Sequence, residues 1–139
     1  IESLPTINFS VYIIRKLPLF VKLDGDGMEG VRNMDVNEFQ QWVKDYYKHR
    51  GWHDLDIFIR IGFLAEETGE VARAIRALEI GRDRPDEEAE SLVNKRRALV
   101  EELGDVLGNV IVIANKYNIA LEEVFHSHKE KLLKRYPID

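Results

Sequence analysis

Two pairs of carboxylates lie on helix faces that should be apolar. In a helical projection at about 100° per residue, Glu67 and Glu70 fall within the stripe formed by their apolar neighbours. Glu102 and Asp105 fall in the same way within the apolar stripe of a later segment. Carboxylates that face one another in a partly buried place repel and are poorly solvated. Either their pKa values rise or a positive group joins them.

The two pairs stand in repeated sequence. Residues 64–71 read LAEETGEV and residues 99–106 read LVEELGDV, at an offset of 35 residues. Leu, Glu, Glu, Gly and Val match at equivalent positions, and Glu70 corresponds to Asp105. The repeat predicts a pseudo-symmetric pair of helices that brings all four carboxylates together.

An all-oxygen ligand set without Cys or His suits a hard cation, Mg²⁺ or Mn²⁺. Because Mg²⁺ prefers to share its coordination shell with substrate phosphates, the chemistry implied is metal-assisted attack on a phosphate ester or anhydride. The alternative is that the acids form ion pairs with basic residues of a neighbouring helix. The candidates for such pairs are Arg73, Arg76, Lys95 and Arg96.

The elements that must position these acids are helices. Residues 1–33 are rich in β-branched and aromatic residues, and they predict a short extended or hairpin arm, either native or an upstream extension. From Met34 onward the apolar spacing is helical, which makes 34–139 the folded domain. We expect an all-α, four-helix bundle. Its helices are expected from the cap at Asp35 to Gly51, and over about 56–79, 87–117 and 120–135.

Composition bounds the class of protein. The chain has 139 residues, 25 Asp and Glu against 20 Lys and Arg, a net charge of −5 and no Cys. This length suits one compact domain, and the acidic balance argues against a stable nucleic-acid partner. The absence of Cys excludes disulfides, zinc fingers and thiolate catalysis. We see no membrane span and no leader, and we therefore expect a cytoplasmic protein.

The motif Glu66-Glu67-x-x-Glu70, followed by Glu102-x-x-Asp105, resembles the MazG-like all-α nucleotide pyrophosphohydrolases. The resemblance covers about residues 34–137, including Gly51-Trp52 and the ending Arg135-Tyr136-Pro137. It implies hydrolysis of a nucleoside or deoxynucleoside triphosphate to the monophosphate and pyrophosphate. It also implies a helical bundle with Mg²⁺, or Mn²⁺, in the acidic site and assembly as a homodimer or homotetramer.

The resemblance also assigns roles to single residues. It implies that the metal ligands are Glu67, Glu70, Glu102 and Asp105. Glu66 is similar to an acid that orients or deprotonates the attacking water, although it is also typical of an exposed helix residue. The candidates for substrate binding are Trp52, which could stack on a base, Asn109, and the cations Lys95, Lys129 and Arg135, which could contact phosphate.

Two departures from the resembled family bear on substrate preference, and two other functions stay open. The gap between Glu70 and Glu102 is longer than is usual in the resembled family, and Asn109 stands where many relatives carry Tyr. A non-catalytic oligomeric interaction module, with Tyr46, Tyr47 and the apolar segment 106–114 at a subunit interface, is one alternative. A di-metal carboxylate bundle of the ferritin-like kind is another, but it needs two Glu-x-x-His pairs. The single candidate for such a pair is Glu123-x-x-His126.

Overall fold

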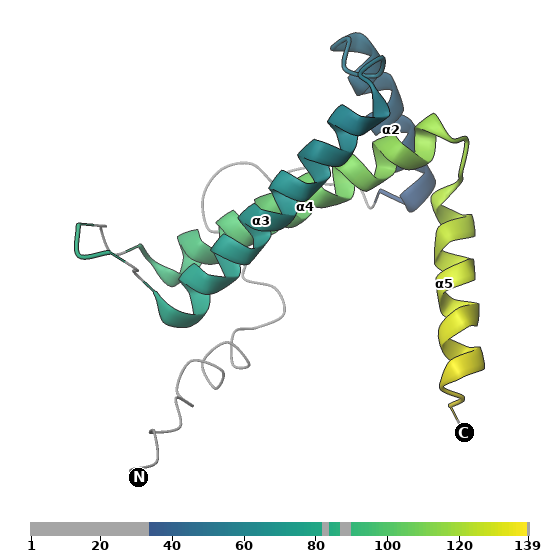
Figure 1. The fold of residues 1–139 in the computed structure, drawn as a ribbon. Coiled ribbons are helices and arrows are strands. Elements are labelled where there is room, and N and C mark those ends of the chain that lie inside the picture. Colours follow the sequence, from purple (N-terminus) through teal and green to yellow (C-terminus); the bar gives the residue numbers. More distant parts are fainter. Residues whose placement is uncertain (1–33, 82–83, 87–89, 139) are drawn as a thin grey trace.

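The computed structural model describes residues 34–81, 84–86 and 90–138 of the chain, and the expected arm over 1–33 lies outside the described residues. The described residues form helices and no strand, so the prediction of an all-α fold is confirmed (Figure 1). The four helices are α2 (Val36–His49), α3 (Ile57–Ile80), α4 (Leu92–Lys116) and α5 (Leu121–Arg135).

The first two described helices begin within a residue of the predicted starts, and the predicted cap at Asp35 is confirmed. The Asp35 carboxylate accepts hydrogen bonds from the backbone N–H groups of Asn37 and Glu38, at 2.9 and 2.8 Å. The Glu38 carboxylate in turn accepts from the backbone N–H of Asp35, which completes a capping box. Asp56 caps α3 by accepting from the N–H of Phe58 at 2.8 Å.

The start of α4 differs from the expectation. The helix expected from about residue 87 begins instead at Leu92, and Glu90 and Ser91 lie outside it. The Ser91 hydroxyl accepts a hydrogen bond from the N–H of Asn94 at 3.2 Å, and Ser91 has extended backbone angles. A side-chain cap of this kind fixes a helix start more strongly than the helix propensity of the acidic residues before it.

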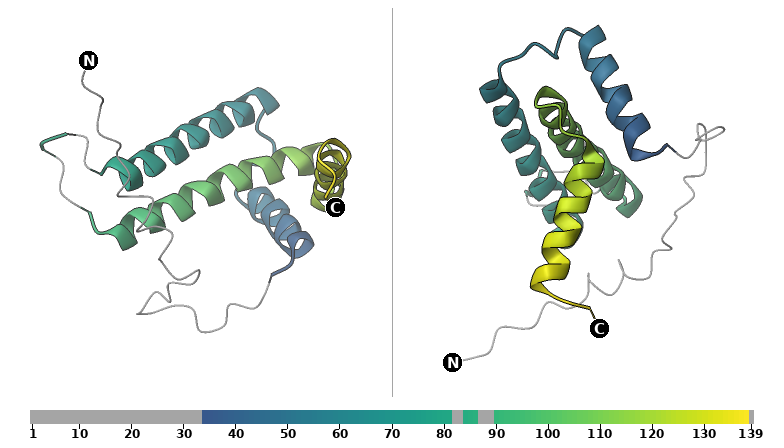
Figure 2. Two further views of the ribbon diagram at one scale, coloured as in Figure 1. Left: turned by 90° about the horizontal axis from the view of Figure 1, so that it is seen from below. Right: turned by 90° about the vertical axis from the view of Figure 1, so that its right-hand side faces the viewer.

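Helices α3 and α4 run antiparallel along most of their length, and α4 lies between α3 and α2 (Figure 2). We call the line of contact between α3 and α4 the seam. The α3 side of the seam consists of Arg60, Leu64, Glu67, Val71 and Ala74, and the α4 side of Leu99, Glu102, Val106 and Asn109, all buried or half-buried. A small apolar core lies where α2 meets α4 and the start of α5. It contains Val43, Ile111, Val112, Ala114 and Leu121.

Helix α5 is attached at one end. The side chain of Gln40 on α2 donates hydrogen bonds to Oδ1 of Asn115 at 3.0 Å and to the carbonyl of Ile119 at 2.8 Å. Its oxygen accepts from the backbone N–H of Leu121 at 2.8 Å. Asn118, in the left-handed region with φ 54°, turns the chain between the helices. Every residue from 122 to 138 is exposed, and α5 extends away from the α3–α4 pair (Figure 1).

An apolar surface remains open on the α3–α4 pair. Several exposed apolar residues follow a seam residue by one position, on both helices. One residue corresponds to a rotation of about 100° around the helix axis, and the two helices run in opposite directions. The residues that follow the seam by one position therefore face the same side of the pair on α3 and on α4. This open apolar face consists of Ile61 and Ile75 on α3 and Val100, Leu103, Leu107 and Val110 on α4. None of the described helices is long and apolar enough to span a bilayer.

The small core predicts a large effect for one substitution. Ile111 is fully buried, so Ile111→Ala removes apolar contacts and leaves a cavity, and it should lower the free energy of unfolding by about 2–5 kcal/mol. Urea denaturation measures this. Val93→Ala, at an exposed position of the same helix, should change it by less than about 0.5 kcal/mol. Equal effects of the two substitutions would show that the core lies elsewhere.

Candidate metal centre

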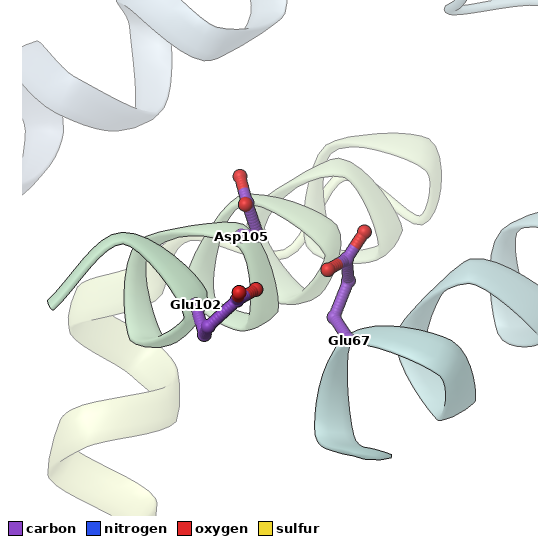
Figure 3. A group of neighbouring side chains, drawn as sticks. All are labelled: Glu67, Glu102 and Asp105. Carbon is purple, nitrogen blue, oxygen red and sulfur yellow. The ribbon is translucent and has the colours of Figure 1, made fainter. Parts of the chain in front are cut away.

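Three carboxylates converge across the seam. Glu67 extends from α3 toward Glu102 and Asp105 on α4 (Figure 3). One oxygen atom from each of the three side chains lies within 4.8 Å of the other two. The repeat in the sequence accounts for this meeting, because it places an acid at the middle of the seam on each of two antiparallel helices. That these residues bind a metal ion stays a prediction.

The electrostatics of the cluster are unfavourable without a cation. Burial raises the pKa of Glu67, and the neighbouring charges of Asp105 and Glu102 raise this pKa further. Glu67 and Glu102 are half-buried, whereas Asp105 is exposed. Within the described part of the chain, no Lys or Arg forms an ion pair with any of the three. The arrangement therefore favours binding of a positive group from outside the chain.

Glu70 has a different partner. Its carboxylate forms an ion pair with Arg73, one turn along the same helix, whereas the ion-pair alternative expected a partner on a neighbouring helix. Glu70 is not among the three residues whose oxygens converge. Its charge nevertheless contributes to the raised pKa of Glu67, which places it within electrostatic reach of the cluster. Its role as a fourth ligand stays a prediction.

Glu66 is exposed and directly precedes Glu67. One residue before a seam position lies about 100° from the seam around the helix axis, in the sense opposite to the open apolar face. Glu66 therefore lies on the opposite side of the pair. Its charge is also among those that raise the pKa of Glu67. The structure thus keeps Glu66 near the cluster, at its solvent side.

The predicted phosphate contacts lie away from the cluster within one chain. Lys95 approaches Gly81 at the end of α3, where its Nζ would be 3.6 Å from a β-carbon built on that glycine. It precedes Glu102 by seven residues, which is about two helical turns. Lys129 and Arg135 are exposed residues of α5, which extends away from the seam. The role of these three residues in substrate binding stays a prediction.

Two other substrate candidates are packed against the chain itself. Trp52 lies in the loop before α3 with its ring edge-on to Tyr47, at 5.5 Å between ring centres, and it remains 40% exposed. Asn109 is buried, and its Nδ2 donates to the backbone carbonyl of Asp105 at 3.0 Å. Its Oδ1 accepts from Nη1 of Arg60 at 3.2 Å. Asn109 therefore connects the two helices beside the cluster.

Arg60 and Tyr47 have no site role in the predictions made from the sequence. Arg60 is a buried cation on the seam, seven residues before Glu67, and this spacing was a signal that could have identified it. Tyr47 of α2 is half-buried, and burial raises the pKa of its hydroxyl. Arg60 lowers this pKa, whereas the charges of Asp105 and Glu67 raise it, so the hydroxyl lies within the field of both groups.

Comparison with known proteins gives two matches. Residues 60–138 match the model of the MazG nucleotide pyrophosphohydrolase domain. The chain is also 50% identical over 103 residues to the uncharacterized protein YvdC of Bacillus subtilis (strain 168), a match that covers 74% of this chain and 97% of that protein. No solved structure matches.

The family match includes α4, α5 and nearly all of α3, and thus every carboxylate of the cluster. It covers more than half of the chain, and the acids converge in an all-α fold, as the resemblance in the sequence implies. The chain therefore belongs to the MazG nucleotide pyrophosphohydrolase domain family.

Proposed function

We propose that this protein is a Mg²⁺-dependent pyrophosphohydrolase that converts a nucleoside or deoxynucleoside triphosphate to the monophosphate and pyrophosphate. The observation that carries the proposal is the convergence of Glu67, Glu102 and Asp105, whose charges no cation of the described chain neutralises. The family match supports the reaction class. In the reaction, a water oxygen forms a bond to the α-phosphorus and the bond from this phosphorus to the α–β bridging oxygen breaks.

The residues present fit a hard divalent cation. The donor set consists of carboxylate oxygens alone, which suits Mg²⁺ and also Mn²⁺. Glu67, Glu102 and Asp105 would hold the ion, and Glu70 would join them by leaving its ion pair with Arg73. When bound, such an ion neutralises charge on the phosphates and lowers the pKa of a bound water.

The side chains around the carboxylates have separate tasks in this proposal. Glu66, exposed beside Glu67, accepts a hydrogen bond from the attacking water and orients it toward the α-phosphorus. Trp52 stacks on the base through the exposed part of its ring. Lys95, Lys129 and Arg135 remain proposed phosphate contacts, which require movement or a second subunit to reach the cluster.

The ferritin-like alternative gains no support from the site. The converging group contains carboxylates and no His among the described residues. Glu123 and His126, the single Glu-x-x-His pair of the sequence, lie on the exposed helix α5. The interaction module is favoured by one observation, the open apolar face, which is equally expected of an oligomeric enzyme.

We propose that a second copy of the chain covers the open apolar face to form a homodimer, or a homotetramer by a further contact. The residues of this face on α4 stand at spacings of three and four, and with Ile61 and Ile75 of α3 they let the antiparallel pair pack on an identical pair as a four-helix arrangement. The face lies on the side of the pair opposite to Glu66, so assembly through it leaves the acidic side free.

The metal should stabilise the fold through Glu67. Saturating Mg²⁺ or Mn²⁺ should raise the melting temperature by several degrees, because the ion binds the assembled carboxylates and not the unfolded chain. Glu67→Gln should abolish this rise, whereas Glu130→Gln, on the exposed part of α5, should retain it. Differential scanning calorimetry with and without metal is the measurement. An equal rise in both variants would contradict the site.

The raised pKa of Glu67 also sets the pH dependence of the metal-free fold. The ionised carboxylate destabilises the fold as the pH rises through this raised pKa, above its ordinary value of 4.5. Glu67→Gln removes this cost, so the metal-free variant should melt at a higher temperature than the wild type near pH 8. The difference should shrink as the pH falls toward about 5. A difference that grows at lower pH would contradict the assigned cause.

Pyrophosphate release tests the activity. The wild type should release pyrophosphate from at least one member of a panel of canonical, deoxy- and damaged nucleoside triphosphates, and only with a divalent metal. Glu67→Gln and Asp105→Asn should each lower kcat/KM by more than about 100-fold, since even outer partners of a metal ligand commonly contribute 10–100-fold. Glu66→Gln should lower kcat and retain the metal-dependent rise in melting temperature. Wild-type rates in both ligand variants would exclude the assignment.

The subunit contact is tested by charge. Leu103→Lys places a cation in the centre of the open apolar face and should convert the assembly to monomers, as measured by sedimentation velocity. Asn94→Lys, at an exposed position of α4 on the opposite side of the helix, should leave the sedimentation coefficient unchanged. Circular dichroism confirms that both variants remain helical. A wild-type assembly that survives Leu103→Lys would place the contact on another surface.

A further inference from the structure

A buried guanidinium lies on the seam, about two helical turns from Glu67, without a carboxylate partner among the described residues. Arg60 is 5% exposed. Its Nη1 donates to Oδ1 of Asn109 at 3.2 Å, and its Nη2 donates to the carbonyl of Trp52 at 3.1 Å. It forms no ion pair with any residue that the structure describes. Because a buried charge without a counter-charge is costly, Arg60 is a poor choice for stability alone.

The guanidinium also contacts two aromatic rings. Its central carbon lies 5.3 Å from the ring centre of Tyr47 and 5.4 Å from that of Phe63. The ring of Tyr47 meets the ring of Trp52 edge-on, with 5.5 Å between their centres. Tyr47 is therefore held between a cation, which favours the face of its ring, and a second aromatic residue. Rotation of its ring away from α4 would break both contacts.

The Tyr47 hydroxyl lies on the cluster side of this arrangement. It approaches Gly108, where a β-carbon built on the glycine would lie 3.7 Å from the hydroxyl oxygen. Gly108 follows Asp105 by three residues, about one turn of α4. The hydroxyl makes no hydrogen bond with any described residue. A half-buried hydroxyl usually forms a hydrogen bond. The Tyr47 hydroxyl therefore has a donor available for a ligand beside the carboxylates.

A donor of this kind complements the acidic site. The carboxylates accept hydrogen bonds but repel a polyphosphate, and the cations proposed from the sequence lie away from the cluster within one chain. A phenol that keeps its proton at neutral pH donates to a phosphate oxygen without adding charge. The raised pKa of Tyr47 is consistent with that protonated state.

We propose that Tyr47 is a further residue of this site, whose hydroxyl donates a hydrogen bond to a phosphate oxygen of the bound nucleotide, and that Arg60 is the positioning residue that holds it there. The inference rests on the proposed nucleotide hydrolysis. It adds to the acidic motif a contact from α2, a helix that lies outside the family match. It also assigns a role to a buried cation that the metal-binding residues do not contact.

Tyr47→Phe tests the hydroxyl, because it removes the donor and retains the ring. It should lower kcat/KM for the best substrate about tenfold, the effect of one hydrogen bond to a charged group. It should leave the melting temperature within about 2 °C of the wild type and retain the metal-dependent rise. Tyr46→Phe, at the exposed neighbouring tyrosine, is the matched control and should leave kcat/KM unchanged.

Arg60 is tested by a double-mutant cycle. Arg60→Met should lower kcat/KM at least as far as Tyr47→Phe does. The double variant should have the same kcat/KM as Arg60→Met alone, because a hydroxyl that is already misplaced makes no contact for Tyr47→Phe to remove. Arg60→Lys keeps the charge but cannot donate from two nitrogens to Asn109 and Trp52, so it should not restore the rate. Losses that multiply in the double variant would show that Arg60 does not act through Tyr47. If Arg60→Met does not fold, Arg60→Lys combined with Tyr47→Phe supplies the same comparison.

The outcomes separate this inference from the proposed function. Pyrophosphate release that is lost in Glu67→Gln but unchanged in Tyr47→Phe overturns the inference and leaves the function standing. If the wild type and Glu67→Gln both release none from any nucleotide, the function itself fails and the inference fails with it. Loss of rate in Tyr47→Phe with an intact fold and intact metal stabilisation supports both.

Discussion

The structure depends on how a helix pair tolerates like charges in its own contact surface. Glu67 faces Glu102 and Asp105 in the middle of the seam, where apolar side chains would otherwise meet. Leu64 and Val71 flank the acid on α3, and Leu99 and Val106 flank the acids on α4. The apolar contacts hold the helices together on either side of the repulsion, so the carboxylates are fixed in place before a cation arrives. Such preorganisation lowers the cost of assembling a binding site.

Much of this arrangement follows from local sequence. The capping residues Asp35 and Asp56 and the apolar spacing give the first two described helices to within a residue or two, because both signals act over one helical turn. The repeat places Glu67 opposite Glu102 and Asp105, since equal spacing on antiparallel helices brings the midpoints together. The expected start of α4 near residue 87 was wrong, because the Ser91 hydroxyl caps the helix and fixes its start at Leu92.

The remaining features depend on contacts between distant parts of the chain. Glu70 lies on the apolar stripe as predicted, yet Arg73 competes for its carboxylate, and the balance between an ion pair and a metal is not encoded in spacing. The environment of Tyr47 is set by the docking of α2 on α4. Sequence periodicity shows that Tyr47 belongs to a helix, but not which side chains of α3 and α4 it meets. Arg60 was missed for the same reason, since its acceptors come from a loop and from another helix.

The attachment of α5 has a consequence for how such chains diverge. The side-chain amides of Gln40 and Asn37 on α2 and one left-handed residue, Asn118, set the direction in which this helix leaves the body of the protein. Beyond Glu122, which accepts a hydrogen bond from Asn37, every described residue of α5 is exposed, so substitutions there leave the seam undisturbed. The direction and the surface residues of α5 can therefore diverge between related chains while the acidic residues of the seam stay the same.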